Sequence, residues 1–247
     1  MRGERCAGPR RALGAIVDLS SVRLVDALAE SGCPLCREGA RDERREIATF
    51  VREGRFSQTS RTLFLAGGGY CRRHAWLLHS RATELGTGAS IVDLYGMVLR
   101  RDLRELDALS RRLSPRRRPR PRRVLARGPC LACERTRVAD ERHAYFLVEA
   151  LREEPVRQSY RRSDGLCVEH ASSVLAAGLA EGELDVVRFI VDDLVSRLNG
   201  LAGRLAEYNR KRDYRYADEP KGDEQQSWMD VIRHYVGEDA WPREDGQ

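Results

Sequence analysis

The chain contains almost no lysine, few aromatic residues and no long apolar run. Only Lys211 and Lys221 are lysines, so 42 of the 44 basic residues are arginines, set against 38 acidic residues. The mean hydropathy is −0.55, and no stretch approaches the roughly 20 apolar residues that cross a membrane. The sequence therefore predicts no membrane-spanning segment and no membrane partner.

The N-terminal segment is basic but lacks the apolar core of a secretory signal. Its apolar stretch, residues 12–17, is short and ends at Asp18, whereas a signal has roughly 7–15 apolar residues and a small-residue cleavage site. We therefore expect a cytoplasmic protein in a reducing compartment. Clustered cysteines there bind metal or do redox work more often than they form disulfides. Cys6, alone in this leader, is interpreted as a free thiol.

Six of the seven cysteines and two of the five histidines follow a pattern that occurs twice. A C-x-x-C pair is followed, after 34 or 33 intervening residues, by a C-x-x-H pair. These eight residues are Cys33, Cys36, Cys71 and His74 in the first half, and Cys130, Cys133, Cys167 and His170 in the second. The two halves are offset by 97 residues at the first pair and 96 at the second, which predicts an internal duplication.

Each half supplies three thiols and one imidazole, a complete ligand set for tetrahedral zinc. The sequence therefore predicts two Zn²⁺ ions per chain. We expect a helical hairpin to return the chain to its first pair, so that each site forms within its own half. Exchange of pairs between the halves is the alternative. An iron–sulfur cluster is the alternative cofactor, because the same residue types hold it.

The surroundings of the ligands support this interpretation. Each ligand pair is predicted to open a helix, where free N–H groups and the positive end of the dipole favour thiolates. Gly67–Gly69 and Gly165 allow sharp turns into the two C-x-x-H pairs. The remaining histidines have no partner at ligand spacing and are interpreted as surface or core residues; they are His79, His143 and His234.

Strand signals are nearly missing, and helical periodicity replaces them. Apolar residues recur every three or four positions over 90–109 and again over 187–205. We expect these two stripes to bury each other and so to pair the halves.

The predicted fold class is all-α: tandem duplicated helical bundles, each around a Cys₃His zinc site, with a helical C-terminal tail. The predicted parts are a flexible leader (1–20), a first zinc-binding repeat (21–110), an Arg/Pro linker (111–128), a second zinc-binding repeat (129–210) and a docking tail (211–247).

Between the halves, residues 110–129 contain nine arginines and four prolines. Without these arginines the net charge of +6 becomes −3, so the basic character belongs to this linker. A solvated, extended linker without a binding role is one interpretation. The other is a flexible nucleic-acid-binding segment whose arginines neutralise phosphates. The candidate phosphate-binding residues are Arg116, Arg117, Arg118, Arg120, Arg122 and Arg123.

The C-terminal segment carries apolar residues at helical spacing. They are Trp228, Met229, Ile232, Tyr235 and Val236. We expect a helix that starts near Asp223, whose carboxylate would cap it, and that docks this apolar face on the bundle. The alternative is a binding surface in which Tyr214, Tyr216 and Trp228 offer stacking area beside arginines.

The chain resembles a bacterial family of uncharacterised proteins, a domain of unknown function. The paired halves of that family carry CPxC and CxxHAW motifs, and its closing segment reads RKxDYRxxDEPxGxExxSW. The matching segments here are CPLC at 33–36, CRRHAW at 71–76, DGLC at 164–167 and RKRDYRYADEP at 210–220. The resemblance runs from about residue 25 to 240. It implies the eight ligands and an all-helical fold, and it carries no function or substrate.

Four protein ligands leave no coordination position open for a substrate. The sequence therefore favours an interaction or scaffold protein with two structural zinc sites and a macromolecular partner. We expect this partner to be a protein, which the sequence does not identify. One alternative is a nucleic-acid-associated protein that uses the linker. The other is an iron–sulfur or dithiol redox protein or sensor. No nucleophile–base pair or phosphate loop stands out, so no catalytic residue is predicted and an enzyme is not favoured.

Overall fold

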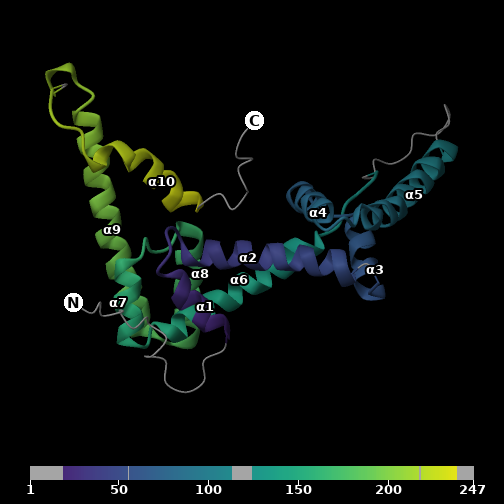
Figure 1. Ribbon diagram of the computed structural model, residues 1–247, viewed down its shortest axis with the longest axis horizontal. Coiled ribbons are helices and arrows are strands. Elements are labelled where there is room, and N and C mark those ends of the chain that lie inside the picture. Colours follow the sequence, from purple (N-terminus) through teal and green to yellow (C-terminus); the bar gives the residue numbers. More distant parts are fainter. Residues whose placement is uncertain (1–18, 55, 113–123, 217, 238–247) are drawn as a thin grey trace, which may run out of the picture. The chain divides into compact units, whose positions relative to one another are not determined.

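A computed structural model of the chain describes residues 19–54, 56–112, 124–216 and 218–237 (Figure 1). These residues form helices and short connections with no strand among them, which confirms the all-α fold class. Cys6, most of the predicted leader and the six candidate linker arginines, Arg116–Arg123, lie outside the described residues. The nucleic-acid alternative therefore rests on the sequence alone.

The α-helices of the described residues are α1 (Leu19–Ala27), α2 (Pro34–Thr49), α3 (Gln58–Gly67), α4 (Arg72–Glu84), α5 (Gly88–Arg112), α6 (Leu131–Ala150), α7 (Glu154–Arg162), α8 (Val168–Glu181), α9 (Leu184–Arg210) and α10 (Ser227–Val236). A π-helical turn, η2 (Phe50–Gly54), extends α2, and two 3₁₀ turns, η3 (Tyr214–Tyr216) and η4 (Asp223–Gln226), precede α10. The order α2–α5 recurs as α6–α9, whose helices begin 97, 96, 96 and 96 residues after their counterparts. The duplication itself stays a prediction.

The chain divides into two compact units, and each draws on both halves of the sequence. The central unit comprises Arg41–Ala139, and the terminal unit comprises the described residues up to Ala40 and from Asp140 onward. The two boundaries fall inside α2 and α6. The units therefore differ from the predicted repeats, 21–110 and 129–210, because each of these two helices begins in one unit and ends in the other.

An aromatic cluster occupies the core of the central unit. The ring centroids of Phe50, Phe64 and Tyr70 lie 5.1–5.5 Å apart, and Tyr95 meets Phe64 edge-on at 5.4 Å. Such tilted and edge-on pairs stabilise a core beyond their buried area. Aliphatic residues from α2, η2, α4, α5 and α6 complete this core: Ile47, Val51, Leu77, Leu78, Leu94, Val98 and Leu131.

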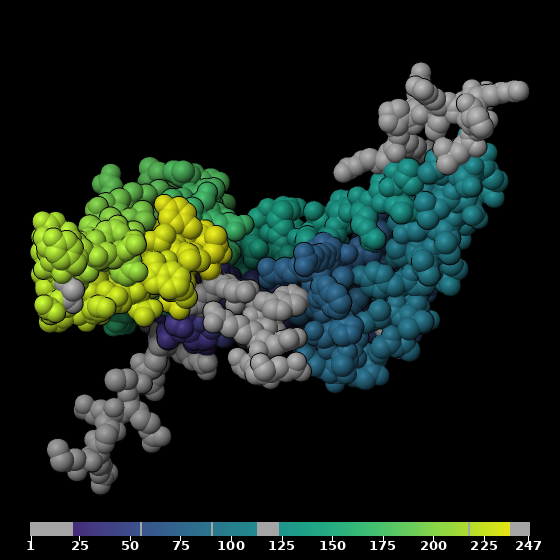
Figure 2. All heavy atoms as spheres, turned by 90° about the horizontal axis from the view of Figure 1, so that it is seen from above, coloured from purple at the N-terminus to yellow at the C-terminus, as the bar shows by residue number. Residues whose placement is uncertain are grey.

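Aliphatic side chains from six helices form the core of the terminal unit. They come from α1, α2, α6, α7, α8 and α9 and include Leu24, Leu28, Leu35, Leu147, Leu151, Val156, Val174, Val186 and Ile190. The C-terminal helix α10 packs against α8 and α9, and Figure 2 shows it in yellow against the surface of α9.

The apolar stripes of α5 and α9 are buried over only part of their length. Leu94 in α5 and Ile190 in α9 are fully buried, but Leu99 is 60% exposed and Val195 is 53% exposed. The expectation that the two stripes bury each other stays a prediction, and within its own unit each stripe is buried only in part. The reason is length: α4 and α8, which pack against α5 and α9, have 13 and 14 residues, whereas α5 and α9 have 25 and 27.

The face of α10 that docks differs from the one that its apolar pattern indicates. Ser227 is fully buried, while Trp228, Ile232 and Tyr235 are 51%, 50% and 61% exposed. A 3₁₀ turn begins at Asp223 as expected near that position, but the α-helix starts at Ser227 and no side chain caps it. The expectation that the aromatic face docks is therefore wrong for these three side chains, because Asp230, on another face of the helix, pairs with Arg204 of α9 at 3.0 Å.

Candidate metal centres

All four ligand pairs begin helices, as the sequence predicts. The first cysteine of each pair directly precedes α2, α4, α6 or α8, and the second ligand lies in the first turn. Residues three apart share one face of a helix, so both side chains of a pair point the same way. Cys71 and Cys167 have the extended backbone of a helix N-cap, with φ of −64° and −71°.

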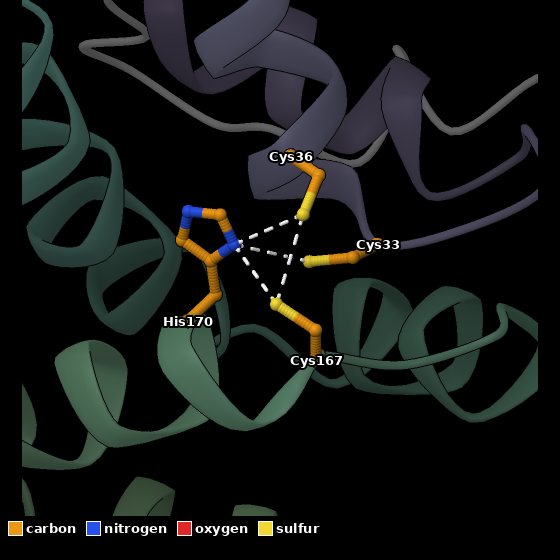
Figure 3. Close-up of side chains that lie close together, drawn as sticks. All are labelled: Cys33, Cys36, Cys167 and His170. Atoms are coloured by element: carbon orange, nitrogen blue, oxygen red, sulfur yellow. Dashed lines mark hydrogen bonds between the residues drawn. The ribbon is translucent and has the colours of Figure 1, made fainter. Parts of the chain in front are cut away.

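Cluster 1 consists of Cys33, Cys36, Cys167 and His170, all in the terminal unit. Figure 3 shows the four side chains pointing toward one another, two from the start of α2 and two from the start of α8. The Nδ1 atom of His170 lies 3.5 Å from Cys33 Sγ, 3.2 Å from Cys36 Sγ and 3.2 Å from Cys167 Sγ. The sulfurs of Cys36 and Cys167 are 3.6 Å apart.

Cluster 2 consists of Cys71, His74, Cys130 and Cys133, all in the central unit. The Nδ1 atom of His74 lies 3.2 Å from Cys71 Sγ, 3.6 Å from Cys130 Sγ and 3.3 Å from Cys133 Sγ. The sulfurs of Cys71 and Cys133 are 3.7 Å apart. The two clusters therefore have the same composition and nearly the same spacing.

Each cluster combines the C-x-x-C pair of one half with the C-x-x-H pair of the other. The expectation that each site forms within its own half is wrong, and the alternative of exchanged pairs is the observed arrangement. The physical reason is an unequal hairpin. Helix α2 has 16 residues and α3 has 10, so the chain advances about 24 Å and returns only about 15 Å. In the second half, α6 has 20 residues and α7 has 9, so the chain again returns over a shorter distance than it advances. The C-x-x-H pair of each half therefore does not come back to the C-x-x-C pair of the same half.

The spacing of both clusters fits a single tetrahedral ion. In each cluster the four donor atoms all lie within 4.8 Å of one another. Sulfur at about 2.3 Å and nitrogen at about 2.0–2.1 Å from one zinc ion place the ligand atoms roughly 3.5–3.8 Å apart at the tetrahedral angle. The six cysteines of the clusters are free thiols. The chain thus contains two Cys₃His clusters able to bind metal.

The donor atoms of cluster 1 lie within hydrogen-bond distance of one another, and these contacts shift their pKa values. Burial lowers the pKa of His170, but hydrogen bonds with Cys167 and Cys33 raise it to about 10. The hydrogen bond with Cys167 raises the pKa of Cys36, whereas hydrogen bonds with Cys33 and Cys36 lower the pKa of Cys167. A metal ion that binds here replaces the protons of these groups, because thiolate and neutral imidazole are the ligating forms.

Glycine turns carry the chain into both C-x-x-H pairs, as predicted. Gly68 and Gly69 have φ of 73° and 89°, and Gly165 has φ of 79°. The N–H groups of Gly68 and Gly69 donate to the carbonyls of Leu65 and Phe64, which closes the end of α3.

Two arginines that the sequence analysis did not single out stabilise these turns. Arg101 donates to the carbonyl of Leu65 at 2.6 Å, at the end of α3. Arg197 donates to the carbonyl of Ser163 at 2.8 Å, at the end of α7. The two arginines are 96 residues apart, the same offset as the C-x-x-H pairs. That shared offset is the signal that would have found them.

Glu43 is a third residue that the sequence analysis missed. Its carboxylate oxygens lie 2.8 Å from His74 Nε2 and 2.8 Å from Arg73 Nη2. Burial raises the pKa of Glu43, but the hydrogen bonds from His74 and Arg73 lower it below its usual value. A carboxylate on the outer nitrogen of an imidazole fixes the tautomer that offers Nδ1 to a metal. No pattern around Glu43 in the sequence indicates this role.

The two clusters differ in their exposure to solvent. Cys33 and Cys167 of cluster 1 are 7% and 3% exposed, and a Cβ atom on Gly237 would lie only 2.6 Å from Cys36 Sγ. In cluster 2, Cys133 is exposed and Cys71 is half-buried. The remaining described histidines, His79, His143 and His234, belong to neither cluster, in agreement with the sequence analysis.

A family model described as a family of unknown function, DUF6062, matches residues 17–240. The chain belongs to this family. The resemblance to an uncharacterised family is thereby confirmed, and the family's description assigns no activity. No curated protein and no solved structure matches the chain. None of the helices in the described residues has the length and apolar character that crossing a bilayer requires.

Proposed function

We propose that the protein is a zinc-binding scaffold with two structural Cys₃His sites, and that it presents its helices to a protein partner. The observation that carries the proposal is the pair of four-residue clusters, whose donor atoms stand at the spacing of one tetrahedral ion. Three thiolates and one neutral imidazole suit zinc better than the hard cations, which prefer oxygen.

The sulfur spacing favours a single ion over an iron–sulfur cluster. The four protein ligands of an iron–sulfur cluster are distributed over two or four iron atoms, so they do not all converge on one point, whereas in each cluster here all four donor atoms lie within 4.8 Å of one another. The distances of 3.6 Å between Cys36 and Cys167, and of 3.7 Å between Cys71 and Cys133, match the single-ion case. Four protein ligands also leave no open position, which favours a structural role over a catalytic one.

The proposed ions would join segments that are distant in sequence. Cys36 and Cys167 are 131 residues apart, and Cys71 and Cys133 are 62 apart. Closing such long loops is entropically costly for the chain, and a metal ion that binds only the folded state offsets that cost. This supports zinc as a part of the fold itself.

A protein partner is supported by apolar side chains that the described helices leave uncovered. Trp228, Tyr235 and Val236 on α10 are 51%, 61% and 72% exposed, and groups of exposed apolar residues mark interaction surfaces. The free thiols of both clusters support a reducing, cytoplasmic location.

The deciding experiment is metal analysis of natively purified protein by mass spectrometry, together with its absorption spectrum. We expect two zinc ions per chain and no visible chromophore. Cys36→Ser and Cys133→Ser should each lower the zinc content by one, while Cys6→Ser serves as the control and should retain both. One zinc ion, none, or the brown colour of an iron–sulfur cluster would refute the proposal.

The structural role has a separate test in the helical circular dichroism of the chelated protein. Structural zinc in small domains contributes on the order of 10 kcal/mol to folding, so a strong chelator should remove much of the helical signal. Full retention of that signal in zinc-free protein would contradict a structural role, even if two ions were bound at the start.

A further inference from the structure

Cluster 2 contains an exposed cysteine, and cluster 1 does not. Cys133 is exposed, and Cys71 and Cys130 are half-buried. In cluster 1, Cys33 and Cys167 are 7% and 3% exposed, and Cys36 is half-buried. The reactivity of a thiolate toward oxidants follows its exposure as well as its charge. A small oxidant in solution therefore meets the sulfur of Cys133 before the sulfurs of cluster 1.

Gly237 adds to the protection of cluster 1. The residue is buried directly after α10, and a Cβ atom at this position would lie 2.6 Å from Cys36 Sγ and 3.8 Å from Cys167 Sγ. Its N–H donates to the carbonyl of Arg233 at 2.9 Å, which closes the end of α10. The backbone of this segment therefore lies directly on one sulfur of cluster 1.

The exposed sulfur of cluster 2 has a partner at close range on another helix. Cys133 lies in the first turn of α6, and Cys71 directly precedes α4. Their sulfurs are 3.7 Å apart, against about 2.05 Å in a disulfide. The two atoms thus need to close by less than 2 Å, which small movements of both side chains can supply.

We propose that cluster 2 is a modification site for peroxides: hydrogen peroxide converts Cys71 and Cys133 into a disulfide, and the bound metal ion is released. This inference rests on the proposed zinc binding. It adds a response to oxidants at one of the two sites, while cluster 1 keeps its ion.

The reaction balances in two steps. The thiolate of Cys133 attacks one oxygen of hydrogen peroxide, the O–O bond breaks, Cys133 becomes a sulfenic acid and hydroxide leaves. The thiolate of Cys71 then attacks the sulfur of that sulfenic acid, the S–S bond forms and a second hydroxide leaves. Two thiolates are oxidised by two electrons in total, one peroxide is reduced, and two protons convert the hydroxides to water.

The disulfide removes two of the four ligands. His74 and Cys130 remain, and two ligands do not complete the tetrahedron that zinc requires. The disulfide still joins the start of α4 to the start of α6. Oxidation therefore changes the site locally while preserving one covalent connection between the two ligand pairs.

The test uses the full-length protein with zinc bound, whose zinc content is measured first. Hydrogen peroxide is added in excess over the protein, and a zinc-sensitive dye follows the release of the metal. We expect one zinc ion released per chain, on the order of tenfold faster than the second. Peptide mass spectrometry should find the disulfide between Cys71 and Cys133.

Two variants separate the proposed reaction from general damage. Cys133→Ser removes the exposed thiol, so we expect the one ion that remains, in cluster 1, to leave only at the slow rate, with no disulfide at Cys71. Cys6→Ser is the control, because Cys6 belongs to neither ligand pattern; this variant should still release one ion quickly and form the same disulfide.

The outcomes distinguish this inference from the proposed function. Fewer than two zinc ions before oxidation would count against the zinc sites themselves. Two ions that leave at equal rates, no release, or a disulfide that includes Cys33 or Cys167 would overturn the peroxide site alone. The last result would identify the cavity of about 500 Å³ that Cys33 and Cys167 line as the path of the oxidant.

Discussion

Glu43 contacts the side of the His74 imidazole that faces away from the sulfurs. Its oxygen lies 2.8 Å from Nε2, while Nδ1 of the same ring lies 3.2–3.6 Å from three sulfurs. Arg73 holds the other carboxylate oxygen at 2.8 Å. The carboxylate therefore fixes both the orientation and the tautomer of the ligand, which is how such partners raise metal affinity.

We expect Glu43→Gln to weaken zinc binding at cluster 2 by roughly 10–100-fold, because the ring loses its charged acceptor. Zinc binding at cluster 1 should not change. Competition with a chromophoric chelator measures both affinities in one titration. Glu84→Gln is the control, since Glu84 is an exposed acidic residue on α4 that pairs with Arg81. Equal zinc affinity in the Glu43 variant and the control would contradict the role of Glu43.

At the scale of helices, Arg101 connects α5 to the end of α3. Its guanidinium donates to the carbonyl of Leu65 at 2.6 Å and to the carboxylate of Asp102. We expect Arg101→Ala to lower the free energy of unfolding by about 1–3 kcal/mol, because a carbonyl at the helix end loses a charged donor. Chemical denaturation measures this change. Arg104→Ala, an exposed position on the same helix, should alter the free energy by much less.

Helix α10 meets cluster 1 through Gly237. This residue has φ of 75° and ψ of −175°, a conformation that is essentially restricted to glycine and costs other residues about 1–3 kcal/mol. A methyl group would also overlap Cys36 Sγ, at 2.6 Å. We expect Gly237→Ala to displace the end of α10 and to speed the loss of zinc from cluster 1, measured with a zinc-sensitive dye.

Gly182 provides the comparison for this variant. It also has φ of 75°, but a Cβ atom there would meet nothing within 4 Å. Gly182→Ala should therefore cost only the left-handed backbone strain, about 1–2 kcal/mol, and should leave the zinc release rate unchanged. If both variants retain zinc equally well, the contact between Gly237 and Cys36 has no part in protecting cluster 1.

The sequence allowed the helices, the ligand residues and the turns to be predicted, because each depends on local spacing. The interval between Cys33 and Cys36 implies a helix start, and Gly68 implies a left-handed turn. The pairing of clusters was not predictable, because it depends on α3 being shorter than α2, and helix ends are weakly encoded. The docked face of α10 was also missed, because Trp228 has the periodicity of a core residue and yet lies outside.

At the scale of the whole molecule, each cluster joins the two halves of the chain. The first half supplies Cys36 to cluster 1 and Cys71 to cluster 2, and the second half supplies the other pair of each. The apolar cores also combine residues of both halves. The core of the terminal unit contains Leu35 of the first half and Leu147 of the second, and the core of the central unit contains Phe50 and Leu131. Within the described residues, neither half alone forms a complete four-ligand cluster or a complete core.

This arrangement predicts the behaviour of a chain divided in the linker. Fragments 1–117 and 118–247, produced together, should copurify in a one-to-one complex with two zinc ions, because each ion takes a ligand pair from each fragment. Either fragment produced alone should bind zinc weakly and show reduced helicity, since loop closure and core burial both require the other. Cys36→Ser combined with Cys71→Ser in the first fragment should weaken the complex by damaging both clusters. Stable, helical fragments that each hold one zinc ion would instead establish pairing within each half, and the exchanged clusters would then be wrong.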